Sequence, residues 1–555
     1  MIRYILAIDQ STSGTKAILF DSKGRLTHRA ALEHRQFYPK PGWVEHDPQE
    51  IYDNTLKAID RVLCDSGVSW EKIAVIAITN QRETVVVWDK ITGKPVYNAV
   101  VWQCGRAAEL CDAIKEQGND ELIREKTGLV LSPFFSAAKL KWILDNVNGA
   151  REKAEAGRLL MGTMDSWLIW KMTGGEVHAT DYSNASRTQL FNIMELQWDK
   201  ELLGLFTIPE SMLPQVRFSD DIFGYTQINH VFTKQIPISG VLGDSHAALF
   251  GQNCFEPGMA KATYGTGSSI MMNIGERPKT SESGLVTSIA WGMKDKLCYV
   301  FEGNINSAGA TIKWLVDDLK LIDDPKNAEI IAQSVDDSRG IYIVPAFSGL
   351  GAPYWDSEAR AMICGITRGA GKAHIVRAAE ESIAYQVKDI LDRMTKEANV
   401  CLQELRVDGG PTRDQFLMQF QADILDVKIS RSAVSELSAL GSAYMAGYAL
   451  GFWDGIGQIT GLRSKSDEFV SNMEDSRRKK LYDGWIDAVK RALSSNRNYS
   501  FGGTALCRIP NLQKLMDFIC GNGFEHHVAM NRSLSSAVLK EALGKYLGWE
   551  VYVHN

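Results

Sequence analysis

The chain has 555 residues, of which 45% are hydrophobic and 23% are charged, and its formal net charge at pH 7 is −6. These values are typical of globular proteins and exclude a largely disordered chain, and the acidic balance gives no indication of a nucleic-acid partner. At about 150 residues per domain, the length predicts three or four domains, or two large ones.

The sequence shows no sign of export or of a membrane. No apolar run approaches the ~20 residues that cross a bilayer, and the N-terminus lacks the pattern of a signal peptide. The nine cysteines are scattered without a CxxC pair. We therefore expect reduced thiols and a cytoplasmic enzyme.

Residues 4–20 open the chain with a predicted strand, turn and strand. The apolar run at residues 5–8 is followed by DQSTSGT at 9–15, and residues 17–20 are apolar again. A turn so rich in glycine and hydroxyl groups offers backbone and side-chain donors together, which suits a phosphate group. A plain hairpin turn explains the same pattern.

Polar residues follow two further buried strands of the first half. Residues 73–78 predict a strand that runs into TNQRET at 79–84, and a second strand is predicted at 85–88. Residues 237–243 lead to Asp244, with a helix predicted from residue 247. Polar groups at the end of a buried strand are placed to reach a ligand. Alternatively, Asp244 caps the helix.

The second half repeats this order of elements. AKATYGTGSSIMM at 260–272 predicts strand, Gly/Thr turn and strand, and residues 405–410 predict a strand ending in two glycines before an amphipathic helix at 416–425. Two hydroxyl- and glycine-rich hairpins, one opening each half, indicate a duplicated domain that clamps a nucleotide between its halves. We expect a linker at 496–503 and then a strand, a Gly-rich turn, a helix and a strand within 504–555.

Dense motifs between residues 3 and 495 resemble the FGGY carbohydrate kinases, and among them the members that act on glycerol. The resemblance rests on GWVEHDP (42–48), NQRET (80–84), VWQC (101–104), FFSAAKLKWILDN (134–146), GLGAPYWD (349–356), and residues 365–366 with 378–382. It implies an α/β fold of two ribonuclease-H-like domains of the actin/Hsp70/sugar-kinase type, with ATP and Mg²⁺ in the cleft between them. We expect domains at 1–250 and 251–495 and an additional segment of unknown role at 496–555.

Positions that match the family's motifs imply a phosphoryl-transfer site. Asp244 matches the catalytic base, which accepts the proton of the substrate hydroxyl, and Asp9 matches the carboxylate that helps to hold Mg²⁺ through water. Lys16 stands where these relatives usually carry Arg. The resemblance assigns the contacts with ATP to Thr12, Ser13, Gly14, Lys16, Thr266, Gly267, Gly309, Gly410 and Asp414, the last at a position where the family commonly has Asn near the adenine.

The substrate pocket partly departs from the family pattern. By resemblance it is formed by Arg82, Glu83, Trp102, Phe134, Asp244 and Ser245. Phe134 replaces a Tyr, Ser245 replaces a Gln, and Ser269 replaces a Phe that closes the pocket. The loss of a phenol oxygen, an amide and a phenyl ring predicts a larger and wetter pocket, and such changes alter specificity.

Three functions fit the sequence. Overall likeness favours phosphorylation of glycerol to glycerol 3-phosphate, whereas the altered pocket favours a larger polyol or ketose such as a tetritol, a tetrulose or a pentulose. The third is an ATP-driven regulator or activator without kinase activity, because residues 504–555 resemble the closing element of actin-like activator ATPases. Relatives of this type imply a homodimer or homotetramer with a small-molecule substrate.

Overall fold

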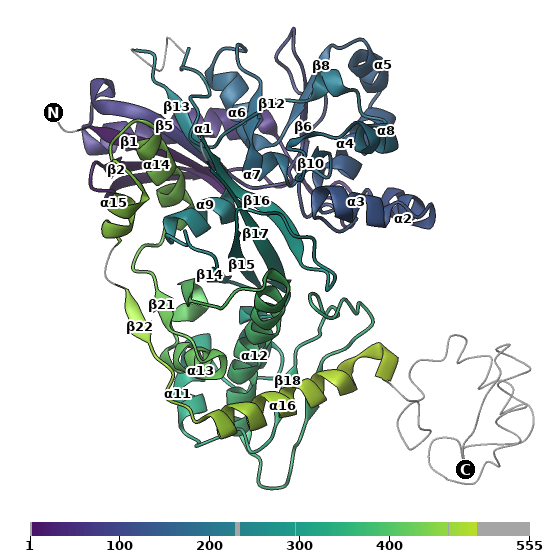
Figure 1. Cartoon of the computed structure of the whole chain (residues 1–555), viewed down its shortest axis with the longest axis vertical. Coiled ribbons are helices and arrows are strands. Elements are labelled where there is room, and N and C mark those ends of the chain that lie inside the picture. Colours follow the sequence, from purple (N-terminus) through teal and green to yellow (C-terminus); the bar gives the residue numbers. More distant parts are fainter. Residues whose placement is uncertain (1–2, 228–233, 295, 464–465, 497–555) are drawn as a thin grey trace, which may run out of the picture. The chain divides into compact units, whose positions relative to one another are not determined.

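The computed structural model describes residues 3–227, 234–294, 296–463 and 466–496, which form mixed helices and strands (Figure 1). The chain divides into two compact units, Met1–Val489 and Lys490–Asn555. The predicted linker, apart from its first residue, and the predicted elements of 504–555 lie outside the described residues. None of the helices formed by the described residues combines the length and hydropathy that a bilayer crossing requires. The cysteines within these ranges are all free thiols.

The first main sheet is built from a hairpin at the N-terminus and two parallel strands. It contains, from one edge to the other, β13 (Ile238–Gly243), β5 (Ile73–Asn80), β1 (Tyr4–Gln10), β2 (Gly14–Asp21) and β3 (Leu26–Glu33). β1, β2 and β3 are antiparallel neighbours, whereas β5 runs parallel to both β1 and β13. The strands predicted at 4–20 and 73–78 are therefore confirmed.

The second main sheet repeats the plan of the first. Its order is β16 (Val286–Met293), β17 (Lys296–Ile305), β15 (Ser268–Gly275), β14 (Met259–Tyr264), β20 (Glu404–Gly409), β21 (Ile429–Arg431) and β22 (Asp467–Phe469). The succession β17-β15-β14-β20-β21 has the same strand directions as β3-β2-β1-β5-β13. The predicted duplication is confirmed by this strand order.

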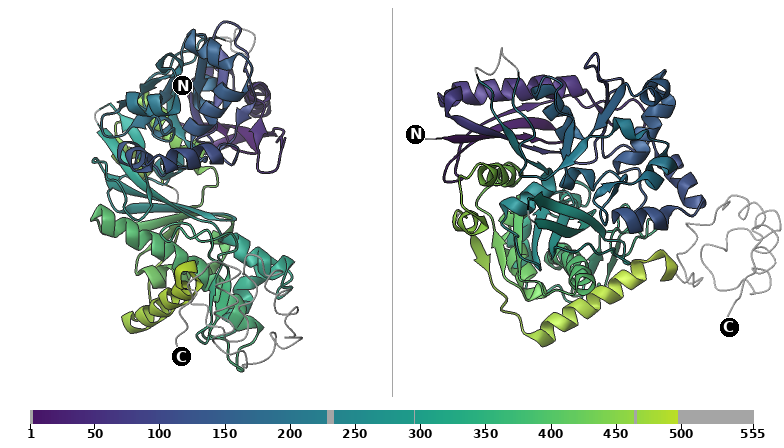
Figure 2. Two further views of the ribbon diagram at one scale, coloured as in Figure 1. Left: turned by 90° about the vertical axis from the view of Figure 1, so that its right-hand side faces the viewer. Right: turned by 45° about the horizontal axis from the view of Figure 1, so that its top comes forward.

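Helices cover both faces of the first sheet, and one of them comes from far along the chain. One cluster packs Leu6 and Ile8 with α1 (Pro48–Ser66) and α6 (Met164–Met172). On the other face, Ile5 and Phe20 pack with α9 (Asp244–Gly251) and α14 (Leu437–Ala449). Helix α14, green in Figures 1 and 2, lies beside the purple strands β1 and β5. The hydrophobic face of the first sheet is thus covered by a helix that follows most strands of the second sheet in the sequence.

One predicted helix begins earlier than expected. Helix α9 begins at Asp244 rather than at residue 247, and its N-cap is Gly243. The interpretation of Asp244 as a capping residue is therefore wrong. The strand predicted at 85–88 is confirmed as β6 (Val86–Asp89), which pairs with β8 (Leu159–Gly162) outside the main sheet.

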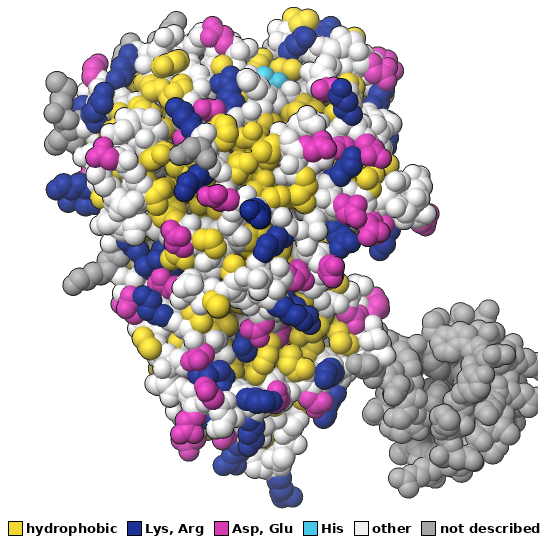
Figure 3. Space-filling view, in the orientation of Figure 1, with side chains coloured by type: hydrophobic (Ala, Val, Ile, Leu, Met, Phe, Trp, Pro, Cys, Tyr) yellow, Lys and Arg dark blue, Asp and Glu magenta, His cyan; other side chains and the backbone are white. Residues whose placement is uncertain are grey.

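Helices α2 (Ala108–Glu116), α3 (Asp120–Thr127) and α4 (Ser136–Asn146) pack with β6 in a separate hydrophobic cluster of the first half. The second half includes α10 (Gly309–Asp317), α12 (Lys372–Ala398), α13 (Gln415–Leu425) and α16 (Asp475–Ala492). Helix α13 confirms the helix predicted at 416–425. On the face shown in Figure 3, the described Lys and Arg side chains are interspersed with Asp and Glu rather than gathered in one stripe.

The register of the parallel strands brings the polar residues of the first half to one edge. Asp9 on β1 lies opposite Thr79 on β5, and Asn80 lies opposite Gly243 on β13. Arg82 and Asp244 each come one or two residues after these strand ends. Because parallel strands present their carboxyl ends at the same edge, this sheet edge is where a ligand site forms.

Candidate active site

Arg82 and Asp244 form an ion pair at the edge of the first sheet. Nε of Arg82 lies 3.1 Å from Oδ1 of Asp244, and the arginine side chain is 8% exposed, against 34% for the aspartate. Burial opposes the charge of Arg82, but Glu302 and Glu83 outweigh it and hold the pKa of the guanidinium above its ordinary value. The structure thus brings together the predicted base and a predicted substrate-binding residue.

Glu83 is held in a strained backbone conformation beside this pair. Its φ angle is 63°, a left-handed value that non-glycine residues adopt at a cost of about 1–3 kcal/mol. The hydroxyl of Ser136 donates to its carbonyl at 3.1 Å, and Nε of Arg187 donates to its Oε1 at 2.5 Å. These contacts fix a carboxylate that is 2% exposed. Such observed strain favours a functional position.

Trp102 and Phe134, two of the residues that the resemblance places in the substrate pocket, form an aromatic wall. Their ring centroids are 5.3 Å apart in an edge-to-face arrangement, and Nε1 of Trp102 donates to Oγ1 of Thr12 at 2.9 Å. The buried Lys139 donates to the carbonyl oxygens of Pro133 and Phe134, and burial lowers the pKa of Lys139 to about 7. The wall is therefore bonded directly to the first Ser/Thr turn.

Two of the substituted pocket positions have polar groups with specific surroundings. The backbone N–H of Ser245 donates to Oδ1 of Asp244 at 2.6 Å. The hydroxyl of Ser269 on β15 is buried and has no hydrogen-bond partner among the described residues. A buried hydroxyl without a partner costs about 1–3 kcal/mol, so Ser269 offers an unused polar group at a position where the resemblance implies a phenyl ring.

The first predicted phosphate turn is tight and contains little side-chain bulk. Ser11 donates its N–H to the carbonyl of Gly14 at 2.9 Å, which leaves Thr12 half-buried and Ser13 exposed between β1 and β2. A Cβ on Gly14 would lie 2.6 Å from the carbonyl oxygen of Leu32. Glycine is therefore required where the turn meets β3.

The second predicted phosphate turn lies on the N-terminus of α10. The carbonyl of Thr266 accepts from Ala308 and Ala310 at 2.9 and 3.0 Å, and Gly309 donates to Gly265 at 3.0 Å. A Cβ on Gly267 would lie 2.2 Å from the carbonyl of Ile305. The structure therefore brings Thr266 and Gly267 together with Gly309, although a long stretch of chain separates them in sequence.

Gly410 lies at the end of β20, next to the second turn. Its predecessor Gly409 has a φ angle of 103° and pairs with Tyr264 on β14. No atom lies within 4 Å of a Cβ added to Gly410, so this backbone faces open space that a ligand can approach.

Asp9 and Lys16 belong to a small charged cluster that includes a residue from the second half. Nζ of Lys16 lies 3.3 Å from Asp9 and 2.7 Å from Glu436, and Arg29 also pairs with Glu436 at 2.7 Å. Burial raises the pKa of the Asp9 carboxyl to about 6 against the opposing effect of Lys16, while Glu436 and Asp244 add to the rise. Lys16 is thus held between two carboxylates.

The residues present fit a magnesium ion held mainly by phosphate and water. Within the described ranges, no group of three or more His, Cys, Asp or Glu side chains is arranged to hold a metal. Mg²⁺ is typically bound by one or two carboxylates together with substrate phosphates and water. Asp244 is close enough to Asp9 to raise the pKa of that carboxyl, and Asp9 directly precedes the first Ser/Thr turn on β1.

Asp414 caps α13 and is paired with a second acid. Its carboxylate accepts from the N–H of Leu417 at 2.8 Å. Burial raises the pKa of Asp414 to about 6 and raises the pKa of Glu380 well above its ordinary value, with Asp414 adding to the rise. Protonation of Glu380 is therefore favoured beside the Asp414 carboxyl, an effect that an Asn at residue 414 would not have.

Arg187, Glu302 and Glu436 were not anticipated from the sequence. Each is buried or nearly so and contacts a predicted site residue. No local pattern marks them, because their partners lie 104 to 420 residues away. Only a three-dimensional arrangement relates them to the site.

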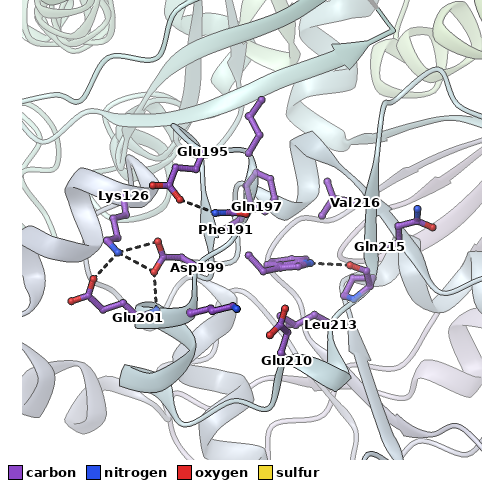
Figure 4. A pocket seen from close by; sticks show the side chains of 14 residues that line it. Lys126, Phe191, Glu195, Gln197, Asp199, Glu201, Glu210, Leu213, Gln215 and Val216 are labelled. Atoms are coloured by element: carbon purple, nitrogen blue, oxygen red, sulfur yellow. Dashed lines mark hydrogen bonds and ion pairs between the residues drawn. The ribbon is translucent and has the colours of Figure 1, made fainter.

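A cavity of about 900 Å³ lies elsewhere in the first half. Figure 4 shows Lys126 between the carboxylates of Asp199 and Glu201, and Glu195 accepting from Gln197. The cavity is lined by Lys126, Phe191, Glu195, Leu196, Gln197, Trp198, Asp199, Lys200, Glu201, Glu210, Leu213, Pro214, Gln215 and Val216. None of these is a predicted site residue, so the cavity is separate from the Arg82–Asp244 site.

Comparison with known proteins identifies the family. The N-terminal domain model of the FGGY family of carbohydrate kinases matches residues 4–251, and the C-terminal domain model matches residues 260–450. The chain belongs to the FGGY family. The expected ATP-dependent carbohydrate or polyol kinase class follows from this membership.

Individual FGGY proteins are similar over most of their length. The chain is 54% identical to a glycerol kinase of Caldanaerobacter subterraneus subsp. tengcongensis over 89% of the chain and 99% of that protein. It is 52% identical to a glycerol kinase of Bacillus velezensis over 89% of the chain and all of that protein. The structure of Plasmodium falciparum glycerol kinase with ADP superimposes with a TM-score of 0.85 at 40% identity, covering 89% of this chain and 98% of that one. The predicted two-domain sugar-kinase fold is confirmed.

Proposed function

We propose that this protein transfers the γ-phosphoryl group of ATP to glycerol and forms glycerol 3-phosphate. The observation that supports it most directly is the Arg82–Asp244 pair at 3.1 Å, with Glu83 beside it. At one sheet edge, the Arg82 cation can donate hydrogen bonds to the hydroxyl groups of a polyol, and the Asp244 carboxylate can accept the proton of the reacting hydroxyl. The names of the relatives at 52–54% identity favour glycerol among the polyols.

In the proposed reaction, Asp244 is the general base. Arg82 and Glu83 hold hydroxyl groups of the acceptor, so that the reacting oxygen faces Asp244. As this oxygen forms its bond to the γ-phosphorus, its proton passes to the Asp244 carboxylate and the bond to the leaving oxygen of ADP breaks. Phosphoryl transfer depends mainly on such positioning and on neutralising charge.

The nucleotide is assigned to the two turns between the sheets. Thr12, Ser13 and Gly14 provide donors from the first turn, and Thr266 and Gly267 from the second. Gly309 and Gly410 offer backbone on which the nucleotide can lie, while Asp414 faces the base. Mg²⁺ held near Asp9 neutralises phosphate charge when bound. Lys16 keeps the charge of Asp9 compensated through the pair at 3.3 Å.

A larger polyol or ketose is a second candidate substrate. Phe134 has no hydroxyl, Ser245 is shorter than an amide side chain, and the buried hydroxyl of Ser269 has no partner among the described residues. A longer acceptor with one more hydroxyl group would supply that partner. This is the specific observation that favours a four- or five-carbon substrate.

An acceptor panel distinguishes these functions. ATP consumption is measured with the full chain on glycerol, erythritol, threitol, erythrulose, dihydroxyacetone, pentitols and pentuloses. We expect the highest kcat/KM with glycerol, whereas a higher value with a four- or five-carbon compound would overturn glycerol and support the second candidate. Turnover with none of them would overturn the kinase function and favour an ATP-driven regulator.

Assembly and cellular location are further parts of the proposal. A dimer or tetramer is expected by likeness to the family, and sedimentation at micromolar concentration will test it. A cytoplasmic location is expected, and fractionation of the source cells will test that.

A further inference from the structure

Four buried charges alternate beneath the proposed substrate pocket. Glu302 on β17 accepts from Nη1 and Nη2 of Arg82 at 2.9 Å each, and it lies 2.8 Å from Nη1 of Arg187. Arg187 in turn donates to Glu83, whose Oε1 is 3.9 Å from Nε of Arg82. The cluster Arg82–Glu302–Arg187–Glu83 is therefore a closed ring of opposite charges.

The ring joins the two halves of the larger unit. Arg82, Glu83 and Arg187 lie in the segment matched by the N-terminal family model, whereas Glu302 lies in the segment matched by the C-terminal one. Glu302 is 2% exposed. The two arginines hold its pKa well below the ordinary value against the effect of burial. The carboxylate is thus ionised and fixed between two cations.

The geometry determines which donors of Arg82 are free. A guanidinium has five N–H groups in a rigid plane. Glu302 takes two of them, and Nε faces Asp244 at 3.1 Å. Two N–H groups are left for acceptor hydroxyls. Because a two-bond pairing of this kind fixes the guanidinium plane, Glu302 also determines the direction in which these two groups point.

Without Glu302, Asp244 would be the nearest alternative partner. The aspartate is already 3.1 Å from Nε, and it is the more exposed of the two carboxylates. If the guanidinium of Arg82 rotated and paired with Asp244 through two hydrogen bonds, its donors would no longer be free for the acceptor. The Asp244 oxygen that must take the acceptor's proton would also be occupied.

We propose that Glu302 is a positioning residue for phosphoryl transfer, which holds the plane of Arg82 toward the acceptor and away from a two-bond pairing with Asp244. The inference rests on the proposed function, because that function gives Arg82 and Asp244 their roles. It adds a residue from the second half to the substrate site, which the motifs of the first half alone do not indicate.

The test compares Glu302→Gln and Glu302→Asp in the full-length protein with the unmodified chain. Glutamine keeps the shape and removes the charge, while aspartate keeps the charge and withdraws the carboxylate by one methylene. We expect kcat/KM for the acceptor to fall about 10²-fold in both, since a displacement near 1 Å can cost that much. The KM for ATP should change less than about twofold.

A matched control separates this role from a purely stabilising one. Glu404 on β20 is also buried and pairs with an arginine, Arg406, at 2.9 Å. We expect Glu404→Gln to lower the melting temperature and leave the acceptor KM unchanged. If both Glu302 variants showed unchanged acceptor kinetics at temperatures where they are folded, Glu302 would be only structural and the proposal would be overturned.

Measurements on the unmodified chain and a crystal structure distinguish a failure of this proposal from a failure of the proposed function. If the unmodified chain prefers another acceptor, the same ratios are measured with that compound. If it turns over none, the crystal structure of Glu302→Gln decides. Arg82 paired through two bonds with Asp244 would support the proposal, and Arg82 in its present orientation would overturn it.

Discussion

Replacing Asp9 with asparagine should stabilise the fold while abolishing catalysis. Burial raises the pKa of Asp9 from 3.8 to about 6, and each pKa unit corresponds to about 1.36 kcal/mol. At pH 8 the ionised carboxylate therefore destabilises the folded state by about 3 kcal/mol, relative to an uncharged side chain. Asparagine has a similar shape and no charge, so the free energy of unfolding of Asp9→Asn should exceed that of the unmodified chain by roughly that amount.

The pH dependence of this gain follows from the direction of the shift. Because the folded pKa is raised, protonation of Asp9 favours folding, and this contribution is complete below about pH 4 and lost as the pH rises through about 6. The stability difference between Asp9→Asn and the unmodified chain should therefore be close to zero at pH 4 and full at pH 8. Turnover should be lost at every pH, because the carboxylate proposed to hold Mg²⁺ is gone.

Urea unfolding at pH 4, 5, 6 and 8, followed by tryptophan fluorescence, measures the difference directly. Asp21 at the end of the neighbouring strand is a control with the opposite sign, since hydrogen bonds from Arg25 and Lys23 outweigh burial and lower its pKa. Asp21→Asn should lose stability at pH 8. A lower or unchanged stability of Asp9→Asn at pH 8 would refute the argument that burial dominates at this carboxyl.

Three further changes test other parts of the site. Asp244→Asn should reduce kcat by ~10²–10⁴ and leave the ATP dissociation constant unchanged by calorimetry; normal turnover would remove Asp244 as the base. Ser269→Phe should lower kcat/KM for five-carbon acceptors relative to glycerol by roughly tenfold or more, and an unchanged ratio would show that residue 269 does not line the pocket. Asp414→Asn keeps the helix cap and removes a buried carboxyl group that adds to the raised pKa of Glu380. Its midpoint of urea unfolding should therefore rise at pH 8, and a fall would contradict the assigned pairing.

The sequence predicted those strands and turns that are specified by local residue patterns. The hairpin at 4–20, its counterpart at 260–272 and the strand before Gly410 all formed as expected, because apolar runs and glycine-rich turns specify them within a few residues. The arginine and carboxylate of the site were found through motifs that resemble the family. Their roles in the reaction are still predictions.

The sequence did not predict interactions between distant segments. Glu302 pairs with Arg82 and Glu436 pairs with Lys16, and in both pairs the two residues are far apart in the sequence. The residues next to Glu302 and Glu436 in the sequence do not distinguish them from ordinary surface acids. Helix α9 began earlier than expected because Gly243 rather than Asp244 has the extended backbone of an N-cap. The pairing of β6 with β8 was likewise not predicted, because β8 lies far along the chain from β6.

The position of α14 on the first sheet has a consequence for synthesis on the ribosome. Ile5, Ile18, Phe20 and Val75 form a buried surface with residues of α14. At ~5–20 residues per second, the interval between translation of β5 and that of α14 is on the order of 20–70 s. Throughout this interval the nascent sheet lacks one of its covering helices and presents apolar side chains to water or to a chaperone. Premature termination before residue 437 would therefore yield an aggregation-prone fragment rather than an independently stable N-terminal domain.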